Sequence, residues 1–362
     1  MTLWDGSDVW LITRYDDARF VLGDRRFSAD LDNGLPALSP ARARPRRLMS
    51  RMDDPRHGEI RRLLADEFVA SRADALRPAI TEIVETQLDR LLAMAPPVDL
   101  HAAFALPVPS RLVGELLGVP RADQRTFQEC TAVLVSRTAT KREFSAADDE
   151  LYALCARLVA ERERKPIDDL LGRLVAAGVS TGRLTREEAC LTTKLLIVGG
   201  HETTANMISM GALTMMLDPA WPEALRERPD LVPNAVEELL RYHTPMHDGL
   251  PRVATEDVMV GETLISAGDG VIVSLVSGNR DAAVFADPDR LDIHRPEARR
   301  HLAFGHGIHN CLGKWIARAE LRVALPALAR RVPTLAIAVP FTEISFREDS
   351  HIYGVHALPV TW

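Results

Sequence analysis

One cysteine, Cys311, lies near the end of a glycine-rich segment, FGHGIHNCLG, which spans residues 304–313. Glycine loses more conformational freedom on folding than any other residue, so this density of glycine indicates that something approaches the backbone closely. The pattern of residues 312–330 predicts a helix directly after the cysteine. A thiolate at a helix N-terminus is stabilised by the helix dipole and by free N–H groups. We therefore expect Cys311 to act as a nucleophile or as a metal ligand.

Three chemistries would suit such a thiolate. A cysteine hydrolase needs a histidine as its base, and His309 is close in the sequence but has no established geometry. Zinc would need further cysteines or histidines at ligand spacing, and none is evident. Haem iron needs only one protein thiolate, and glycines would allow the backbone to lie against a flat macrocycle.

A polar cluster interrupts the apolar helix that is predicted for residues 185–217. Thr185 and Glu188 form a capping box, which is a strong signal for a helix start. A helix of about 32 residues would be about 48 Å long, so it has to cross the core. The cluster itself, GGHETTAN, occupies residues 199–206 in the middle of this helix.

Within this cluster, Gly199, Gly200 and Thr203 share one helix face. Each of the adjacent glycines weakens a helix by about 1 kcal/mol relative to alanine, and burial of Glu202 would be costly without a purpose. Two interpretations stay open at this point. The segment is a helix–helix crossing with Glu202 at a solvated edge, or it is half of a site that another segment completes.

Glu238 and Arg241 lie three residues apart in PNAVEELLRY, residues 233–242, on one face of a predicted helix. Such a pair is ordinarily a surface ion pair worth about 0.2–0.5 kcal/mol. The pair alone predicts no function. Its position upstream of the cysteine segment is what gives it interest.

The composition is that of an ordinary soluble protein. Of the 362 residues, 46% are hydrophobic, and a net charge of -7 leaves no basic excess for phosphates, which argues against nucleic acid as a partner. Four scattered cysteines cannot form a disulfide framework, so we expect a reducing, cytoplasmic location. We expect no membrane association, because no signal peptide and no apolar run long enough to span a bilayer is evident.

The periodicity predicts a single, mainly α-helical domain over residues 1–362 with a small β portion. Strand-like stretches lie near residues 1–13, 251–273 and 334–362, and residues 3–13 are expected to form a hairpin. The long loop over residues 31–52, rich in proline and arginine, is a solvated loop or a binding element. Helical stretches are expected near residues 16–23, 55–69, 72–94, 108–117, 121–135, 147–163, 168–177, 185–217, 233–242 and 312–330.

Together these segments resemble the motifs of the cytochrome P-450 monooxygenases. FGHGIHNCLG is similar to the haem-binding loop of that family, GGHETT to its oxygen-activation motif and EELLR to its Glu-x-x-Arg motif, in the family's order. Arg295, in LDIHRP, matches the arginine that joins Glu238 and Arg241 in a buried structural ion network. The resemblance covers essentially the whole chain and is closest to soluble bacterial, actinomycete-type members. It implies the P-450 fold, in which haem lies between a long central oxygen-binding helix and the cysteine-loop helix.

Two features depart from the family pattern. The family ordinarily has a further helix and the start of a strand before residues 3–13, so we expect a shortened N-terminal segment, either a truncation or an unusual start. Gly199 stands where alanine is commoner, which should widen the local groove slightly.

The resemblance implies that Cys311 is the axial ligand of haem iron, since an anionic sulfur favours O–O cleavage. The loop glycines would let N–H groups approach the sulfur and tune its basicity. Glu202 and Thr203 match the family's acid–alcohol pair, in which the hydroxyl bonds the oxygen and the carboxylate relays protons from solvent. Gly200 would leave space for the oxygen itself.

The resemblance also implies a set of cations for the two haem propionates. His57 and Arg61, one helical turn apart in PRHGEIRR, match the family's propionate pair, and Arg252 and His309 match the other two. The cofactor-binding residues that it implies are Cys311, His57, Arg61, Arg252, His309, Phe304, Gly305, Gly307 and Gly313.

Substrate contacts are expected from the loop over residues 31–52 and from positions that core packing would explain equally well. These positions are Val198, Gly199, Met246, Gly249, Leu250 and Ile352. The chain has no flavin- or nucleotide-binding stretch, so electrons must come from NAD(P)H through a ferredoxin reductase and a ferredoxin. Arg62, Lys314 and Arg318 would form a basic patch for an acidic ferredoxin, or a solvated helix face.

We therefore predict a monooxygenase that uses haem b and O2 to hydroxylate or epoxidise an apolar small molecule. Secondary-metabolite tailoring and xenobiotic oxidation are the settings that the resemblance implies. The alternative is a haem-thiolate binding or sensor protein without turnover, which would need neither Glu202 nor Thr203. A hydrolase that uses Cys311 and His309 is the third possibility.

Overall fold

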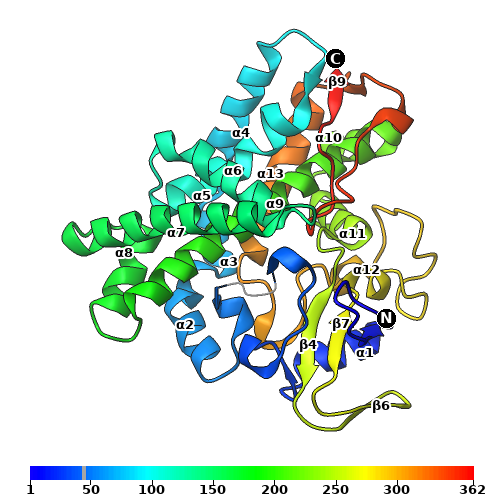
Figure 1. The fold of residues 1–362 in the computed structure, drawn as a ribbon. Coiled ribbons are helices and arrows are strands. Elements are labelled where there is room, and N and C mark those ends of the chain that lie inside the picture. Colours follow the sequence, from blue (N-terminus) through cyan, green and yellow to red (C-terminus); the bar gives the residue numbers. More distant parts are fainter. Residues whose placement is uncertain (43–45) are drawn as a thin grey trace.

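The structure, a computed structural model, describes residues 1–42 and 46–362. Helices form most of it, and a small β region lies at one side, next to the N-terminal helix α1 (Figure 1). The helices are α1 (Tyr15–Gly23), α2 (Arg56–Leu64), α3 (Ala70–Ala75), α4 (Arg77–Leu92), α5 (Pro107–Leu117), α6 (Gln124–Val135), α7 (Lys141–Arg164), α8 (Leu170–Leu174), α9 (Arg186–Leu217), α10 (Ala220–Glu227), α11 (Val232–His243), α12 (Leu275–Gly278) and α13 (Lys314–Arg331). No helix in these ranges combines the length and apolarity that would let it cross a membrane.

The strands are short and form two sheets and a hairpin. They are β1 (Val9–Ile12), β2 (Phe27–Ser28), β3 (Val98–Asp99), β4 (Leu250–Ala254), β5 (Val258–Val260), β6 (Thr263–Ile265), β7 (Gly270–Val273), β8 (Ala336–Ile337) and β9 (Pro359–Thr361). The larger sheet has the order β1-β7-β4-β2, the smaller one has the order β3-β9-β8, and β5 pairs with β6.

The hairpin predicted for residues 3–13 is wrong in its main pairing. An isolated antiparallel bridge joins Thr2 to Asp8 around a tight turn, but β1 pairs in parallel with β7, from Val9 opposite Gly270 to Ile12 opposite Val273. An alternating strand pattern shows that a strand forms but does not identify a partner more than 250 residues away.

The longest helix, α9, crosses the helical part of the molecule, where it is drawn in green (Figure 1). Its capping box is formed as predicted, since the Thr185 hydroxyl accepts from the Glu188 N–H and the Glu188 carboxylate accepts from the Thr185 N–H. It packs against α5, α7 and α13. A helix that is buried on nearly all sides needs apolar neighbours on nearly all sides.

Two apolar clusters divide α9 between them. Cys190 and Ile197 belong to a cluster with α6 and α7, whereas Met207 and Leu213 belong to a cluster with α4 and α13. The polar segment GGHETTAN, residues 199–206, therefore lies at the seam between the two clusters. A break in apolar packing at this point makes room for a site.

Several boundaries differ from the predicted ones. The helix α10 was not predicted, residues 72–94 divide into α3 and α4, and α13 begins at Lys314 instead of 312. Residues 334–362 form mainly irregular structure around two short strands. The loop over residues 31–52 contains three short 3₁₀ turns, at Leu31–Asn33, Pro40–Arg42 and Met49–Arg51, while residues 43–45 lie outside the described residues.

Candidate active site

The cysteine loop is closed by hydrogen bonds of its own backbone. The Cys311 N–H donates to the Phe304 carbonyl at 2.8 Å. The Asn310 side chain donates to the carbonyls of Phe304 and Gly305 at 3.1 and 3.0 Å. Gly305 and Gly307 have φ of +69° and +71°, a left-handed conformation that favours glycine. The loop is thus a rigid turn that fixes where the sulfur lies.

The three loop glycines do not play one role. A Cβ at Gly307 would lie 2.2 Å from the Leu22 carbonyl oxygen, so this glycine is required by packing on α1 and not by an approach to the sulfur. A Cβ at Gly305 would lie 3.4 Å from Leu250. Nothing lies within 4 Å of a Cβ placed at Gly313. Of these glycines, only Gly313 fits the predicted opening toward a cofactor.

Cys311 is exposed to a small free space although protein surrounds it at longer range. Desolvation in these surroundings raises the pKa of the thiol, and the Gly313 N–H and the Arg61 charge lower it by less. Cys311 precedes the helix N-cap, Gly313, by two residues. The thiolate stabilisation predicted from the helix start is therefore outweighed by burial in the protein alone.

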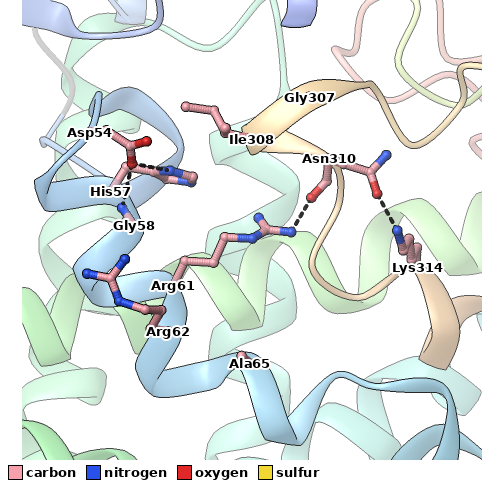
Figure 2. Close-up of a pocket in the computed structure, with 10 residues that line it drawn as sticks. All are labelled: Asp54, His57, Gly58, Arg61, Arg62, Ala65, Gly307, Ile308, Asn310 and Lys314. Carbon is pink, nitrogen blue, oxygen red and sulfur yellow. Dashed lines mark hydrogen bonds and ion pairs between the residues drawn. The ribbon is translucent and has the colours of Figure 1, made fainter. Parts of the chain in front are cut away.

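Four cationic or hydrogen-bond-donating side chains converge beside this loop, from α2, from β4 and from the loop itself. The rings of His57 and His309 lie 4.1 Å apart between centroids. Arg61 donates to the Asn310 carbonyl at 2.6 Å, as Figure 2 shows. Arg252 is 5% exposed, and among the residues that the structure describes its guanidinium bonds only the neighbouring Pro251 carbonyl.

No carboxylate among the described residues pairs with Arg61 or Arg252, although Asp53 lies near Arg252 and Asp54 lies near His57. Burial lowers the pKa of Arg252 to about 10, and burial with the nearby Arg252 charge lowers the pKa of His309 to about 3. The His309 Nε2 and His57 Nδ1 atoms have no hydrogen-bond partner among the described residues, and the Asp54 carboxylate is 3.7 Å from His57 Nδ1. Buried cations without partners are unfavourable, so the cluster fits a ligand that brings carboxylates, as the two haem propionates would.

On the opposite helix, α9, the face at the seam is open. Gly199 is exposed although it lies mid-helix, and a Cβ there would meet nothing within 4 Å. The Thr203 hydroxyl donates to the Gly199 carbonyl at 3.0 Å. Leu312, which follows the cysteine, packs against the apolar cluster that contains Ile197. Ile197 precedes Gly199 by two residues on α9.

Gly200 does not face this opening, and the prediction that it leaves space for oxygen is wrong. A Cβ at Gly200 would lie 2.6 Å from a methyl group of Val113 on α5. The absent side chain of Gly200 therefore permits close packing of two helices. The open position on this face is Gly199.

Glu202 does not lie at a solvated edge. It is 3% exposed, and its carboxylate accepts from Arg347 Nη1 at 2.7 Å. The ion pair joins α9 to the C-terminal segment. Glu202 is therefore not itself open to solvent, and its role in a proton relay stays a prediction.

The predicted ion network is present and fully buried. Arg241 donates to both oxygens of Glu238 at 2.7 and 2.8 Å, and Arg295 donates to the same carboxylate at 3.0 Å. Both arginines also bond backbone carbonyls in residues 279–290. One carboxylate thus holds α11 to the segment that leads to the cysteine loop.

The positions predicted for substrate contact do not all face free space. Val198 and Gly199 flank the opening on α9, and Met246 pairs with Ile352 through an isolated antiparallel bridge. A Cβ at Gly249 would lie 2.6 Å from the Val273 carbonyl oxygen, and its φ is +76°. Gly249 is therefore a packing glycine against β7, and its predicted substrate contact stays a prediction.

The basic patch predicted from Arg62, Lys314 and Arg318 retains Arg62 and Lys314, whereas Arg318 is paired with a carboxylate. Arg318 donates to the buried Glu237 at 2.6 and 2.7 Å, so its charge is largely neutralised. Arg62 and Lys314 line a surface hollow of about 480 Å³ between α2 and the cysteine loop (Figure 2). Arg299, Arg300 and Arg19 line an adjacent hollow.

Two functional candidates were not found in the sequence. Arg347 contacts Glu202 from 145 positions further along the chain. Arg51 adds positive charge beside Arg252, and burial lowers its own pKa. The run of arginines in the loop over residues 31–52 indicated a basic segment, but it did not distinguish Arg51 from the neighbouring arginines.

A helical fold with a cysteine loop facing an open, polar seam in its longest helix is that of a haem-dependent monooxygenase. Comparison with known proteins gives the family. The family model described as cytochrome P450 matches residues 116–332. Cytochrome P450-SU2 of Streptomyces griseolus is 46% identical over 368 residues, which cover 100% of this chain and 89% of that protein. The chain belongs to the cytochrome P450 family.

Other relatives and solved structures agree with this assignment. Pentalenic acid synthase of Streptomyces avermitilis is 43% identical, with 100% of this chain and 90% of that protein covered. The structure of mycinamicin VIII C21 methyl hydroxylase from Micromonospora griseorubida matches with a TM-score of 0.95 at 41% identity, over 100% of this chain and 92% of that chain. That of the thaxtomin hydroxylase TxtC matches with a TM-score of 0.96 at 40% identity, over 100% and 95%. Members of the family use haem b and O2 with electrons that come from NAD(P)H through redox partners.

Proposed function

We propose that this P450 hydroxylates an apolar secondary metabolite at an unactivated C–H bond, and that Cys311 would hold the haem iron through its sulfur. In the overall reaction one atom of O2 enters the C–H bond and the other leaves as water, which consumes two electrons from NAD(P)H and two protons. Relatives named for methyl hydroxylation of a mycinamicin and for hydroxylation of thaxtomin support the substrate class. The observation that carries the proposal is an exposed cysteine beside the buried Arg252 and beside nitrogens of His57 and His309 that have no hydrogen-bond partner among the described residues.

When bound, haem supplies the activation of O2, and this chain supplies its surroundings. Arg61, Arg252, His57 and His309 would hold the two propionates, which removes the unfavourable isolation of these buried groups. Cys311 is held in place by its N–H bond to Phe304. This closed loop would present the sulfur as the ligand of haem iron.

The opposite face supplies protons and excludes water. The Thr203 hydroxyl, held by the Gly199 carbonyl, borders the open space, and Glu202 is the nearest acid on α9. The apolar clusters on both sides of residues 199–206 keep bulk water away from that space. Val198, Met246, Leu250 and Ile352 are the proposed apolar contacts for the substrate.

The test is the absorption spectrum of the purified protein after reduction with dithionite under carbon monoxide. A strongly red-shifted band is expected, because a thiolate ligand changes the spectrum of the carbonyl complex. The Cys311→Ser variant should bind haem with the same propionate cluster and lack the band. A wild-type protein that contains haem without the band would overturn the role of Cys311.

We propose that electrons arrive from an acidic ferredoxin at the face formed by Arg62, Lys314, Arg299 and Arg300, beside the exposed Ile308 and Trp315. The ferredoxin is reduced in turn by an NAD(P)H-dependent reductase. The cytoplasmic location predicted from the cysteines agrees with such partners and stays a prediction. With a surrogate ferredoxin and reductase, the proposed enzyme should consume NAD(P)H and form a hydroxylated product. A haem sensor without turnover would form no product.

A further inference from the structure

Glu202, in the polar segment 199–206 of α9, forms a buried ion pair with Arg347 of the C-terminal segment. The Glu202 carboxylate accepts from Arg347 Nη1 at 2.7 Å, and their side chains are 4% and 10% exposed. The Arg347 N–H donates to the Gly354 carbonyl at 2.9 Å, so the C-terminal segment presents this guanidinium to α9. A buried ion pair is expensive to desolvate and contributes little to stability, so its presence beside a reaction space calls for another reason.

The atoms around this pair form an unfinished hydrogen-bond network. Asn206 Nδ2 donates to the Glu202 carbonyl at 2.9 Å, and His201 Nε2 lies 3.9 Å from the Glu202 carboxylate. His201 Nε2, Asn206 Oδ1 and Arg347 Nε have no hydrogen-bond partner among the residues that the structure describes. Buried polar atoms of this kind are ordinarily satisfied by ordered water, which also conducts protons.

These atoms lie on the side of α9 that faces the C-terminal segment. A Cβ at Gly354 would lie 1.9 Å from Asn206 Oδ1, so that segment approaches this side of the helix as closely as a glycine permits. Gly199 and Thr203, in contrast, border the open space. Glu202 therefore lies between two regions of α9. One is the open space beside Gly199 and Thr203, and the other is the polar, buried side that faces the C-terminal segment.

We propose that Arg347 is a positioning residue for proton delivery, which holds the Glu202 carboxylate by an ion pair at the inner end of a polar path formed by His201, Asn206 and Arg347. Protons would reach Glu202 along this path, from the side of the C-terminal segment, and pass to Thr203. The inference rests on the proposed monooxygenase function. The other ionisable groups on this side are His101, whose ring bonds Ser209 and whose pKa is lowered by burial, and His356, whose charge also lowers the pKa of His101.

The first measurement needs no turnover. A buried carboxylate that loses its only cation takes up a proton. Burial already raises the pKa of Glu320 in wild type, so the infrared spectrum of Arg347→Leu should contain one protonated-carboxyl band in addition to those of wild type, and this band should be absent from Arg347→Leu/Glu202→Gln. Arg347→Lys keeps the cation and should lack the band. If Arg347→Leu shows no such band, Arg347 does not set the state of Glu202 and the proposal fails.

The second measurement uses the haem-loaded protein with a surrogate ferredoxin and reductase, without substrate. Arg347→Leu should slow NAD(P)H consumption by about 10- to 100-fold, the range for outer partners of a site. It should also raise the solvent deuterium isotope effect, and Arg347→Lys should restore most of the rate. In Arg347→Leu/Glu202→Gln the loss should be no larger than in Glu202→Gln, because Arg347 acts through Glu202.

Controls separate this proposal from a structural role and from the proposed function. Arg331→Leu removes different ion pairs, with Glu85 and Asp89 on α4, and should leave the isotope effect unchanged. The carbon monoxide band should persist in every variant. A wild-type protein without that band would sink the monooxygenase function, whereas an additive double variant or an unchanged isotope effect in Arg347→Leu would overturn the role of Arg347 alone.

Discussion

At the scale of single residues, the most informative feature is the incomplete hydrogen bonding of Arg252, His57 and His309. Arg252 is buried, the carbonyl of its neighbour is its single hydrogen-bond acceptor among the described residues, and the rings of His57 and His309 lie 4.1 Å apart. A folded protein tolerates such a cluster only when something else completes it. The cost of the empty cluster is thus a measure of how strongly haem is held.

Removal of one cation should weaken haem retention. Arg252→Leu deletes one charge-assisted contact, each worth about 1.5–3 kcal/mol, so haem should dissociate about 10- to 100-fold faster to an apomyoglobin acceptor. The measurement is the loss of haem absorbance with time. Arg125→Leu, at an exposed helical ion pair with Glu129, is the control and should retain haem as wild type does.

The sequence predicted the residues whose spacing is local and missed those whose partners are distant. Cys311 and its loop, and His57 with Arg61 one helical turn later, are recognisable because a few adjacent positions carry the pattern. Arg347 acts through Glu202, 145 positions away, and no periodicity connects them. Gly200 was misassigned because a glycine needed for packing has the same letter as one that opens a cavity.

At the scale of elements, α9 shows how one helix serves two functions. Its ends belong to separate apolar clusters, and residues 199–206 lie between them. The capping box and the apolar run were sufficient to predict the helix, from Thr185 onward. Which glycine faces the opening depends on the position of α5, which the helix's own sequence does not contain.

The two adjacent glycines of α9 should respond oppositely to the same substitution. Gly200→Ala places a methyl group 2.6 Å from Val113 and should destabilise the protein by about 1–3 kcal/mol. Gly199→Ala meets open space and should stabilise the helix by about 1 kcal/mol. Chemical denaturation of the two variants measures both effects. Equal destabilisation would contradict the orientation of this face.

A second prediction concerns α13. Glu320 is 2% exposed, its Oε1 has no partner in the described part of the chain, and burial raises its pKa well above 4.5. The folded state therefore binds this proton more tightly than the unfolded state, and stability is lost as the pH rises above 4.5.

The Glu320→Gln variant should abolish this contribution, which has a slope of at most about 1.4 kcal/mol per pH unit. Thermal melts between pH 4 and pH 9 should show the variant gaining on wild type as the pH rises. Glu82→Gln, at an exposed position of α4, is the matched control and should follow wild type. A gain that grows toward low pH would refute the assignment.

At the scale of the whole molecule, the haem region separates two surfaces with different tasks. The C-terminal segment and α9 enclose the polar path, while α2, α1 and the cysteine loop form the face with Arg62, Lys314 and the exposed Trp315. The net charge of -7 hides this local basic face. Composition could not predict it, because it depends on which surfaces folding brings together.

Charge reversal on that face should slow electron delivery. Arg62→Glu should reduce the rate constant for reduction by an acidic ferredoxin by about 10-fold at low ionic strength, because steering by charge acts on encounter. The difference should vanish at about 1 M salt, where the screening length is about 3 Å. Stopped-flow reduction at two salt concentrations measures this, with Arg125→Glu as the control. A difference that persists at high salt would contradict an electrostatic role.

Because the four cysteines differ in exposure, the number of reactive thiols should report whether the site at Cys311 is occupied. Cys130, Cys155 and Cys190 are buried, and burial raises the pKa of each thiol, to about 11 for Cys130. Cys311 is exposed. A thiol-specific label should therefore react with one equivalent per empty molecule and with none once the sulfur is ligated. The number of labelled thiols then reports directly what fraction of a preparation has acquired its prosthetic group.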